Sequence, residues 1–405
     1  MKKNHLNITD AIGTGEDRTA RIDACLGSVC ARNLRRKCVA VVGVGALGGP
    51  VLQHLAMLAI QEMILIDPGL VEEPNLGNQC FDAGHVGMTK VAARREQIAR
   101  IHPSCTVCVY PVRLETLGWG ILARADLVIC CLDNLAGRIR LNEICSHLQL
   151  PWIDGATDGS GRLMFGRVAS FGSHPDAPCF ICSFDQRQLT EALSAERRGC
   201  RSWWNDPNPS PPTLSVSPEC AVIAGLQCIE AIKRLTETIS PSISTEMLVD
   251  LDSMRMQPVE LQRNLRCLNS HKPFGELIPV DRSLSIGATL AWLQKESGMD
   301  SCIRLYKRIF ISHVRCVACG GLVPVGLLDS AFTPDKALCS CGNTVTPNPH
   351  SQHDTITREN AEGFLERSWN DIGLADREIM SGCVGENEVH LIAVKKLVPE
   401  EKYHD

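Results

Sequence analysis

The sequence contains no long hydrophobic run and no concentration of positive charge. Its 405 residues carry a formal net charge of -5, and the lysines and arginines are scattered apart from short clusters such as residues 32–37. A membrane-spanning helix needs roughly 20 consecutive apolar residues, and no stretch approaches that length. The basic start, residues 1–18, also lacks the apolar core of a leader peptide. The sequence therefore predicts neither membrane insertion nor nucleic-acid binding, and it favours a cytoplasmic protein.

An internal repeat is absent as well, and the length is sufficient for two or three domains. The composition is 44% apolar, which supports ordinary buried cores, and it includes 21 cysteines. So many cysteines would indicate a disulfide scaffold in a small secreted chain. In a large chain without a leader they indicate buried thiols, metal ligands or a nucleophile, so each thiol needs its own argument.

The clearest motif is a glycine turn within residues 39–69. Gly43, Gly45 and Gly48 have the G-x-G-x-x-G spacing between a β-branched run and a helix-like segment. Such glycines bring backbone N–H groups close to a pyrophosphate, and the positive end of the following helix attracts its charge. Asp67 ends the next strand-like run, where a carboxylate can hold ribose hydroxyls. The pattern predicts a nucleotide site, and the alternative is a tight turn that only packs a helix on a sheet.

Strand-like and helix-like segments alternate from residue 37 to residue 240. This alternation predicts a Rossmann-like, doubly wound α/β fold with a mostly parallel sheet. A strand within residues 162–171 follows its predecessor closely, so we expect it to run antiparallel. Residues 217–235 are apolar nearly all round and predict a buried helix. We expect an N-terminal helical segment at 1–36, an α/β domain at 37–272 with a crossover loop at 196–214, and a small α+β domain at 273–405. Residues 361–396 are expected to give a helix, a turn and a terminal strand.

Further motifs follow the glycine turn in a fixed order. They include an Asn-Leu pair, a Gly-x-x-Lys and a later Asp-Asn, preceded by an Arg-x-x-Arg at 18–21 and followed by an LQxxEAIK helix at 226–233. The matching positions are Asp67, Val71, Asn75, Leu76, Gln79, Gly87, Lys90, Asp133 and Asn134. In this order the motifs resemble the adenylating superfamily of ThiF, MoeB, HesA and the ubiquitin-activating enzymes. The resemblance covers residues 18–272.

The resemblance implies an enzyme that uses ATP and Mg²⁺ to activate a carboxylate as an acyl-adenylate. That reaction needs fixed cations to neutralise the charge around the α-phosphate. By resemblance, Lys90 reaches the phosphates, Asp133 holds Mg²⁺, Asp67 holds the ribose, Asn75 positions the nucleotide, and Arg21 reaches across a homodimer. The implied nucleotide-binding set is Gly43, Gly45, Gly48, Asp67, Asn75, Gln79 and Lys90. Taken singly, Asp133 also fits a helix cap, Lys90 a solvated helix residue and Arg21 a surface charge.

Two positions depart from the pattern of the superfamily. Gly69 stands where a second acid is usual after Asp67, and Asn78 stands where the superfamily has the arginine of an Arg-Gln pair. The second departure removes a phosphate contact. The chain would then bind the γ-phosphate less well or use another arginine, such as Arg18 or Arg94.

Ubiquitin-activating enzymes pass the acyl group to a cysteine, and Cys200 lies in the corresponding region. It is flanked by Arg197, Arg198 and Arg201, and neighbouring positive charge favours a reactive thiolate. Cys220 is the alternative, because it falls in the first turn of the 217–235 helix, whose dipole also favours a thiolate. A chain with no essential thiol remains the third possibility.

Cys179 and Cys182 form a C-x-x-C where the superfamily commonly places half of a structural zinc site. The other half is usually a second C-x-x-C, but here Cys267 is followed by His271 four residues on. The resemblance therefore implies a Cys₃His site for structural Zn²⁺. The alternative is a pair of unmetallated thiols.

A second set of cysteines resembles a zinc ribbon at residues 313–345. Two cysteine pairs lie about twenty residues apart, each followed by glycine, which is the pattern of two metal-binding turns. The ligands are expected to be Cys316, Cys319, Cys339 and Cys341. Three neighbouring histidines, His313, His350 and His353, are expected to be surface residues.

From these motifs we predict that the chain is an activating enzyme for a ubiquitin-like protein with a C-terminal glycine. Adenylation would come first, thioester transfer to Cys200 second, and the 273–405 domain would dock a conjugating enzyme. The enzymatic alternative activates a sulfur-carrier protein for thiamine or molybdopterin synthesis. A third, non-enzymatic alternative is an inactive nucleotide-binding scaffold. The C-terminal residues contain no diglycine, so we do not expect the chain to be a modifier itself.

Overall fold

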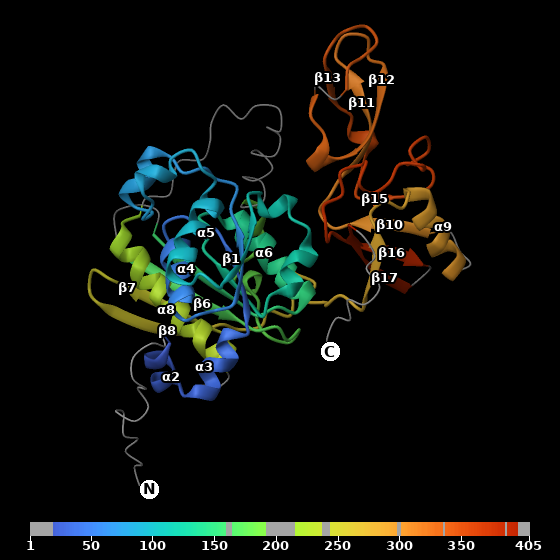
Figure 1. The fold of residues 1–405 in the computed structure, drawn as a ribbon. Coiled ribbons are helices and arrows are strands. Elements are labelled where there is room, and N and C mark those ends of the chain that lie inside the picture. The colour runs from blue at the N-terminus through green and yellow to red at the C-terminus, as the bar shows by residue number, and fades with distance from the viewer. Residues whose placement is uncertain are drawn as a thin grey trace. The chain divides into compact units, whose positions relative to one another are not determined.

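The computed structural model describes residues 19–158, 164–191, 215–236, 244–297, 301–334, 337–384 and 387–395. The chain forms two compact units (Figure 1). Among the described residues, the first comprises 19–115, 122–158, 164–191, 215–236 and 244–273, and the second comprises 116–121, 274–297, 301–334, 337–384 and 387–395. Within the described ranges, no helix combines the length and the apolar composition that a membrane span requires.

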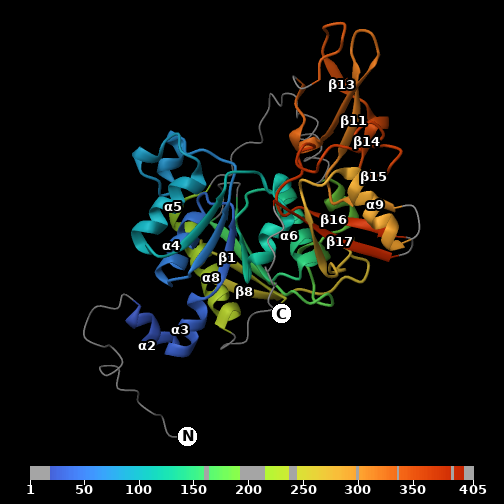
Figure 2. The same ribbon diagram turned by 45° about the vertical axis from the view of Figure 1, so that its right-hand side comes forward.

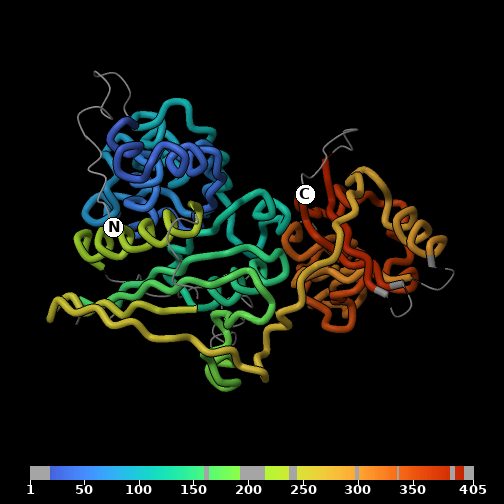
Figure 3. The backbone as a smooth tube through the Cα atoms, turned by 90° about the horizontal axis from the view of Figure 1, so that it is seen from below, coloured from blue at the N-terminus to red at the C-terminus, as the bar shows by residue number. Residues whose placement is uncertain are grey.

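The first unit is built on an eight-stranded sheet of order β3-β2-β1-β4-β5-β6-β7-β8. Its strands are β1 (Cys38–Val42), β2 (Glu62–Ile66), β3 (Thr106–Tyr110), β4 (Leu127–Cys130), β5 (Trp152–Thr157), β6 (Phe165–Phe171), β7 (Thr245–Asp250) and β8 (Arg255–Glu260). The first five run parallel, and β6 turns back antiparallel to β5 as the sequence predicts. Figure 3 shows β7 and β8 in yellow at the edge of the sheet. The doubly wound α/β fold class is thereby confirmed.

Helices cover both faces of this sheet. They are α2 (Ala20–Leu26), α3 (Ser28–Arg35), α4 (Gly48–Met57), α5 (Lys90–Ile101), α6 (Leu135–Leu148) and α8 (Ser217–Thr236). Helices α4 and α8 pack together on one face, and α6 lies on the other (Figures 1 and 2). Because β1, β2 and β4 are buried by both layers, they are nearly continuous runs of apolar residues. Helix α8 buries residues along its whole length, but Val222 and Ile229 are 39% and 50% exposed, so the helix predicted to be buried is buried on one side only.

In its described residues, the second unit combines two small sheets with one α-helix, α9 (Ile286–Ser297). The order β15-β10-β16-β17-β9 joins Thr355–Ile356, Ser301–Leu305, Ile379–Val384, Asn387–Val394 and Leu277–Asp281. The other sheet pairs β11 (Phe310–Cys316) with β12 (Leu322–Leu328), β13 (Val345–Pro347) and β14 (Gln352–His353). The helix expected at the start of the stretch 361–396 is wrong, since residues 361–374 form mainly turns. Gly363 and Gly373 both have positive φ there, which ends helical geometry.

One short segment of the chain, Thr116–Ile121, leaves the first unit and completes the second. Trp119 is 1% exposed, and its ring lies 5.5 Å from Tyr306 and 6.2 Å from Phe274. The buried Arg308 donates to the Leu117 carbonyl at 3.0 Å and to Glu378, which is itself buried. The sequence reading did not place this segment in the second unit, because a helix-like stretch carries no sign of a distant packing partner.

We expect Trp119→Ala to destabilise the second unit by about 3–5 kcal/mol, the usual cost of emptying a buried aromatic site. Hydrogen exchange followed by mass spectrometry should show lost amide protection in β10, β16 and β17. Trp292→Ala is the matched control, because Trp292 belongs to the same unit but is 38% exposed. Equal protection in both variants would show that the indole of Trp119 does not support this unit.

Candidate functional site

A cavity of about 490 Å³ lies where β1, β2 and β4 end in the first unit. In doubly wound sheets, ligands bind at the carboxyl ends of the strands, at the point where the strand order reverses. That point lies here between β1 and β4. Of the residues predicted to hold the nucleotide and Mg²⁺, those on the cavity wall are Gly43, Gly45, Asp67, Gln79, Lys90 and Asp133. Gly48 and Asn75 are not on the wall.

Each of the three glycines of the turn is needed for its own structural reason. Gly43 has φ +86°, and a Cβ on it would lie 2.6 Å from the Cys131 carbonyl oxygen. A Cβ on Gly48 would collide with the Gly43 carbonyl oxygen. Gly45 is different, because a Cβ there would meet only the Gln79 side chain at 3.5 Å. Gly43 and Gly48 therefore allow close packing of strand, turn and helix, and Gly45 keeps the cavity open.

The carboxylate of Asp67 is fixed by two backbone donors. Val44 N–H donates to one oxygen at 2.9 Å, and Gly69 N–H donates to the other at 2.7 Å. A Cβ on Gly69 would lie 3.0 Å from Asp67 Oδ1 and 3.2 Å from Lys90 Cδ. The departure at Gly69 thus leaves room for the acid and the lysine to lie close to each other. Lys90 is placed by the start of α5, where Thr89 caps the helix through Ala92 N–H.

The loop after β2 carries Asn75, Asn78 and Gln79. Asn75 Oδ1 accepts from Glu72 N–H at 3.0 Å, so its side chain shapes the short helix Glu73–Gly77. Gln79 lines the cavity, and its Oε1 is buried without a hydrogen-bond partner among the described residues. A buried acceptor without a partner is costly, and a bound ligand that donates a hydrogen bond would satisfy it.

Arg94 does not replace the arginine that is missing at Asn78. Its guanidinium is buried, and its five N–H groups reach five acceptors: the carbonyls of Val44, Gly45, Gln79 and Cys80 and the side chain of Gln97. The guanidinium also lies 3.9 Å above the Phe81 ring, and burial lowers the pKa of Arg94 to about 10. Arg94 therefore ties the glycine turn to the loop, and Arg18 lies outside the described residues.

Two arginines on the cavity wall were missed by sequence reasoning. Arg138 donates to Asp154 at 3.0 Å and to the Leu132 and Gly155 carbonyls, so it braces the wall. Arg113 lies after β3, its side chain is 75% exposed, and its Nε is 3.6 Å from Glu115. Only the strand that precedes Arg113 could have indicated it, because strand ends meet at this edge of the sheet.

Asp133 and its neighbour Asn134 follow β4. Asn134 Oδ1 accepts from Gly137 N–H at 2.7 Å and caps α6. The carboxylate of Asp133 is therefore not the helix cap, and it lies exposed on the cavity wall, where a hydrated Mg²⁺ with phosphate would find an oxygen ligand. Arg21 is an exposed residue of α2 and does not line this cavity.

Of the two candidate nucleophiles, the structure describes only Cys220. Cys200 lies outside the described residues. Cys220 lines the cavity in the first turn of α8, but it is 1% exposed, and burial raises its pKa. The neighbouring Glu219 is also buried, with a raised pKa and an Oε1 atom without a partner among the described residues. Burial thus opposes the effect that the helix dipole was expected to have on Cys220.

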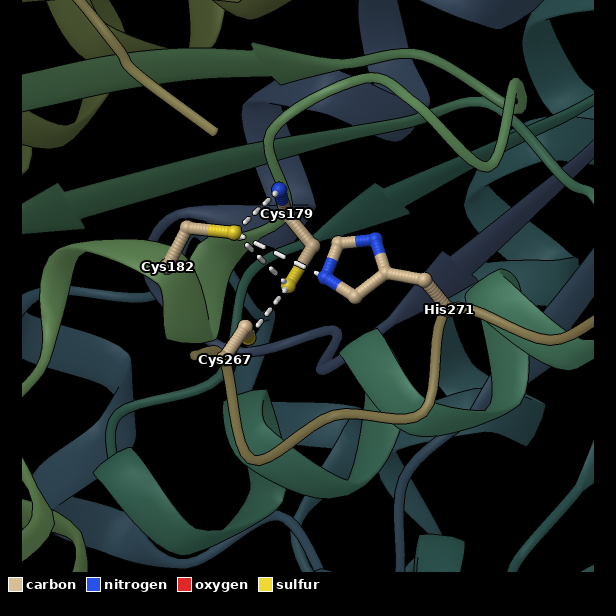
Figure 4. Close-up of side chains that lie close together, drawn as sticks. All are labelled: Cys179, Cys182, Cys267 and His271. Carbon is tan, nitrogen blue, oxygen red and sulfur yellow. Dashed lines mark hydrogen bonds between the residues drawn. The ribbon is translucent and has the colours of Figure 1, made fainter. Parts of the chain in front are cut away.

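Cys179, Cys182, Cys267 and His271 meet at one point of the first unit (Figure 4). The sulfur of Cys179 lies 3.7 Å from that of Cys267 and 3.8 Å from that of Cys182. Cys182 Sγ lies 3.6 Å from His271 Nε2. A tetrahedral zinc ion with its usual bond lengths would separate two sulfurs by about 3.8 Å and a sulfur and a nitrogen by about 3.6 Å. The donor set and its spacing fit structural Zn²⁺.

Polar groups surround these thiolates. Arg263 and Asn269 donate to Cys182 and Cys179, each at 3.7 Å, and the Cys179 N–H donates to Cys182 Sγ at 3.4 Å. Such donors orient metal ligands and stabilise their negative charge. The second predicted set, Cys316, Cys319, Cys339 and Cys341, is also brought together, in the second unit.

The fold and the cavity define a nucleotide-binding α/β protein, and comparison with known proteins gives its family. Residues 18–271 match the ThiF family, so the chain belongs to it. The superfamily predicted from the motifs is confirmed. Membership supports adenylyltransferase activity, with ATP as the nucleotide.

Curated relatives carry related names. The chain is 30% identical over 232 residues to the molybdopterin-synthase adenylyltransferase of Salmonella typhimurium, covering 56% of this chain and 85% of that one. It is 31% identical over 153 residues to the adenylyltransferase and sulfurtransferase UBA4 of Eremothecium gossypii, covering 37% of this chain. The match spans only 34% of that UBA4. Among solved structures, E. coli MccB with ATP has a TM-score of 0.52 at 18% identity, covering 64% of this chain and 75% of that one, which supports the fold.

We expect His271→Ala to lower the zinc content of the purified protein by about one ion per chain, because three thiolates leave one position open. Elemental analysis by plasma emission measures the zinc content. We also expect the midpoint of thermal unfolding to be lower in the variant. His174→Ala is the control, since His174 lies in the preceding loop with a side chain that is 74% exposed. An unchanged zinc content in His271→Ala would contradict a Cys₃His site.

Proposed function

We propose that the chain adenylates the C-terminal carboxylate of a small protein that ends in glycine, and that this substrate is a sulfur carrier. The observation that supports the chemistry most is the cavity, which gathers the glycine turn, Asp67, Lys90 and Asp133 at one end of the parallel sheet. We assign the adenylation domain to residues 37–272 and a separate domain to 273–405.

In this reaction a carboxylate oxygen attacks the α-phosphorus of ATP, and the bond from that phosphorus to the β-phosphate bridge oxygen breaks. Pyrophosphate leaves, and a mixed anhydride with AMP forms. Lys90 holds negative charge on the phosphates, and Asp67, fixed by two backbone N–H groups, accepts from the ribose hydroxyls. Mg²⁺, when it is bound with the nucleotide, screens the phosphate oxygens, and Asp133 supplies an oxygen ligand.

The names of the relatives favour a sulfur carrier over a ubiquitin-like modifier. The Salmonella relative is named for molybdopterin synthase, and the Eremothecium relative is named both adenylyltransferase and sulfurtransferase. Thioester transfer was the main expectation from sequence, and it requires a reactive thiol on this chain. Cys220 is a poor candidate because burial raises its pKa. An inactive scaffold is less favoured, because the cavity retains both charged groups, Lys90 and Asp133.

Assembly with other proteins belongs to this proposal as well. The exposed position of Arg21 in α2 is compatible with a homodimer in which it reaches the second copy's nucleotide. A conjugating enzyme as partner would follow only if a thioester forms. We therefore place the homodimer in the proposal and make the conjugating enzyme conditional on the detection of a thioester.

Adenylation is tested by ATP–pyrophosphate exchange with Mg-ATP and each small diglycine-ending protein of the same genome. We expect exchange that depends on the carrier, and we expect Lys90→Ala to reduce it roughly 100- to 1000-fold, the usual cost of losing a charge-stabilising donor. Lys37→Ala is the matched control, because Lys37 pairs with Asp126 and does not line the cavity.

Intact mass on non-reduced samples separates the alternatives. Carrier-dependent exchange without an adduct on this chain supports the sulfur-carrier proposal. A thiol-sensitive adduct that disappears in Cys200→Ala would instead support ubiquitin-like activation. Exchange that is absent with every carrier would refute adenylation and favour the scaffold.

Arg113 is expected to supply the phosphate charge that Asn78 lacks. Charge-assisted hydrogen bonds contribute about 1.5–3 kcal/mol, so Arg113→Gln should raise the KM for ATP roughly 10- to 100-fold. Adding Asn78→Arg to that variant should restore the KM, because both positions line the cavity. A KM that is unchanged in Arg113→Gln, or a double variant with no recovery, would exclude this role.

A further inference from the structure

The second cysteine cluster lies outside the residues that match the ThiF family, which end at 271. We propose that Cys316, Cys319, Cys339 and Cys341 bind one structural Zn²⁺, and that this ion holds the sheet of β11, β12 and β13 together. The site is independent of the adenylation proposal, because all four ligands belong to the second unit.

The four sulfurs come from two turns of similar design. Cys316 ends β11 and Cys319 lies in the turn before β12, where the Gly320 N–H donates to the Cys316 carbonyl at 3.1 Å. Cys339 and Cys341 lie in the turn before β13, where the Gly342 N–H donates to the Cys339 carbonyl at 2.8 Å.

Glycine is needed in both turns. Gly320 has φ +69° and Gly342 has φ +78°, a region that residues with a side chain rarely adopt. A Cβ on either glycine would meet no atom within 4 Å, so the conformation rather than crowding selects glycine. The sequence thus provides two tight turns whose sulfurs face each other.

The spacing of the sulfurs fits a metal ion between the turns. Cys316 Sγ lies 3.5 Å from Cys341 Sγ, and Cys319 Sγ lies 3.5 Å from Cys339 Sγ. Both close pairs join one turn to the other. All four sulfurs lie within 4.8 Å of one another. A zinc ion with four bonds of about 2.3 Å would place each pair of sulfurs about 3.8 Å apart, so a small expansion accommodates it.

The surroundings of the cluster favour thiolates bound to a cation. Cys316 is 2% exposed and Cys339 is 8% exposed, and buried thiolates are costly without a compensating charge. Asn343 Nδ2 donates to Cys341 Sγ at 3.5 Å, as groups around metal-bound sulfur do. With four protein ligands the ion has no open position, which makes it structural rather than catalytic.

Nearby histidines do not enter this set. The His353 ring nitrogen lies 3.3 Å from Ser312 Oγ, and the His313 ring packs against Phe364 at 5.9 Å. Among the described residues that offer metal ligands, the cluster consists of the four cysteines alone. The all-sulfur set separates it chemically from the Cys₃His cluster of the first unit.

The small sheet needs such a cross-link. Among the described residues, its core cluster has six buried members, on which three partly buried ones pack: Ile311, Val314, Val325, Phe332, Ala337 and Val345, with Ile309, Val323 and Leu327. So few apolar side chains supply little stabilisation, and small modules of this kind commonly depend on a metal or disulfides. No disulfide links these four cysteines, so a shared metal ion is the cross-link that their side chains can form between the two turns.

The test is metal content and zinc X-ray absorption on the full chain and its variants. We expect two zinc ions per parent chain. One ion should have three sulfur ligands and one nitrogen ligand and the other four sulfur ligands, which gives seven sulfurs and one nitrogen for the two ions together. Cys319→Ser with Cys341→Ser should lose one ion and leave a shell of three sulfurs and one nitrogen. Cys302→Ser with Cys383→Ser is the matched control, because these half-buried cysteines belong to the same unit but not to the cluster, and it should keep both ions.

A second variant keeps the proposal testable if the double serine variant fails to fold. His271→Ala removes the ion of the first unit, so the ion that remains should have four sulfurs at about 2.3 Å and no nitrogen. A parent with no more than one zinc per chain, all of it lost in His271→Ala, would overturn the proposal. So would a double serine variant that keeps two ions, or iron in place of zinc in the all-sulfur site.

Discussion

The nucleotide cavity depends on one buried guanidinium. Arg94 donates to the carbonyls of Val44 and Gly45 on the glycine turn and to those of Gln79 and Cys80 on the loop after β2. The Gly45 carbonyl also accepts from Gly49 N–H, and the Cys80 carbonyl also accepts from Gln97. The Val44 and Gln79 carbonyls receive no other hydrogen bond among the described residues, so without the arginine they would be acceptors with no donor. The phosphate turn and the loop opposite it therefore keep their separation because one positive group joins them.

The same helix carries the cation that we assign to the substrate. Lys90 and Arg94 are four residues apart in α5 and so lie on one side of it. One cation is buried and satisfied by protein oxygens, and the other is half-buried and lines the cavity. Arg94 lies close to the site but cannot replace the arginine that is missing at Asn78, because its N–H groups already donate to backbone carbonyls and to the Gln97 side chain.

Much of the first unit could be predicted, because its signals are local. Each strand or helix pattern, the spacing of Gly43, Gly45 and Gly48, and the position of Asp67 at the end of an apolar run can be recognised within a short stretch of sequence. The metal clusters were predicted from pairs of cysteines, since short spacings constrain where the sulfurs lie. Arg113, Arg138 and the partners of Arg94 were not, because their positions depend on contacts between segments far apart in the chain. The turns at 361–374 were missed because glycines in an otherwise helix-like pattern do not reveal their φ angles.

Because of the Thr116–Ile121 segment, the second unit is not encoded by one continuous part of the gene. Among the described residues, the second unit comes from two distant stretches of coding sequence, and the earlier one is a few residues in the middle of the ThiF region. Fusing codons 274–405 to another adenylating enzyme would transfer most of the unit without the indole that fills its aromatic cluster. A new host would have to supply an equivalent of Trp119 in its own chain, so the two parts are bound to be inherited together.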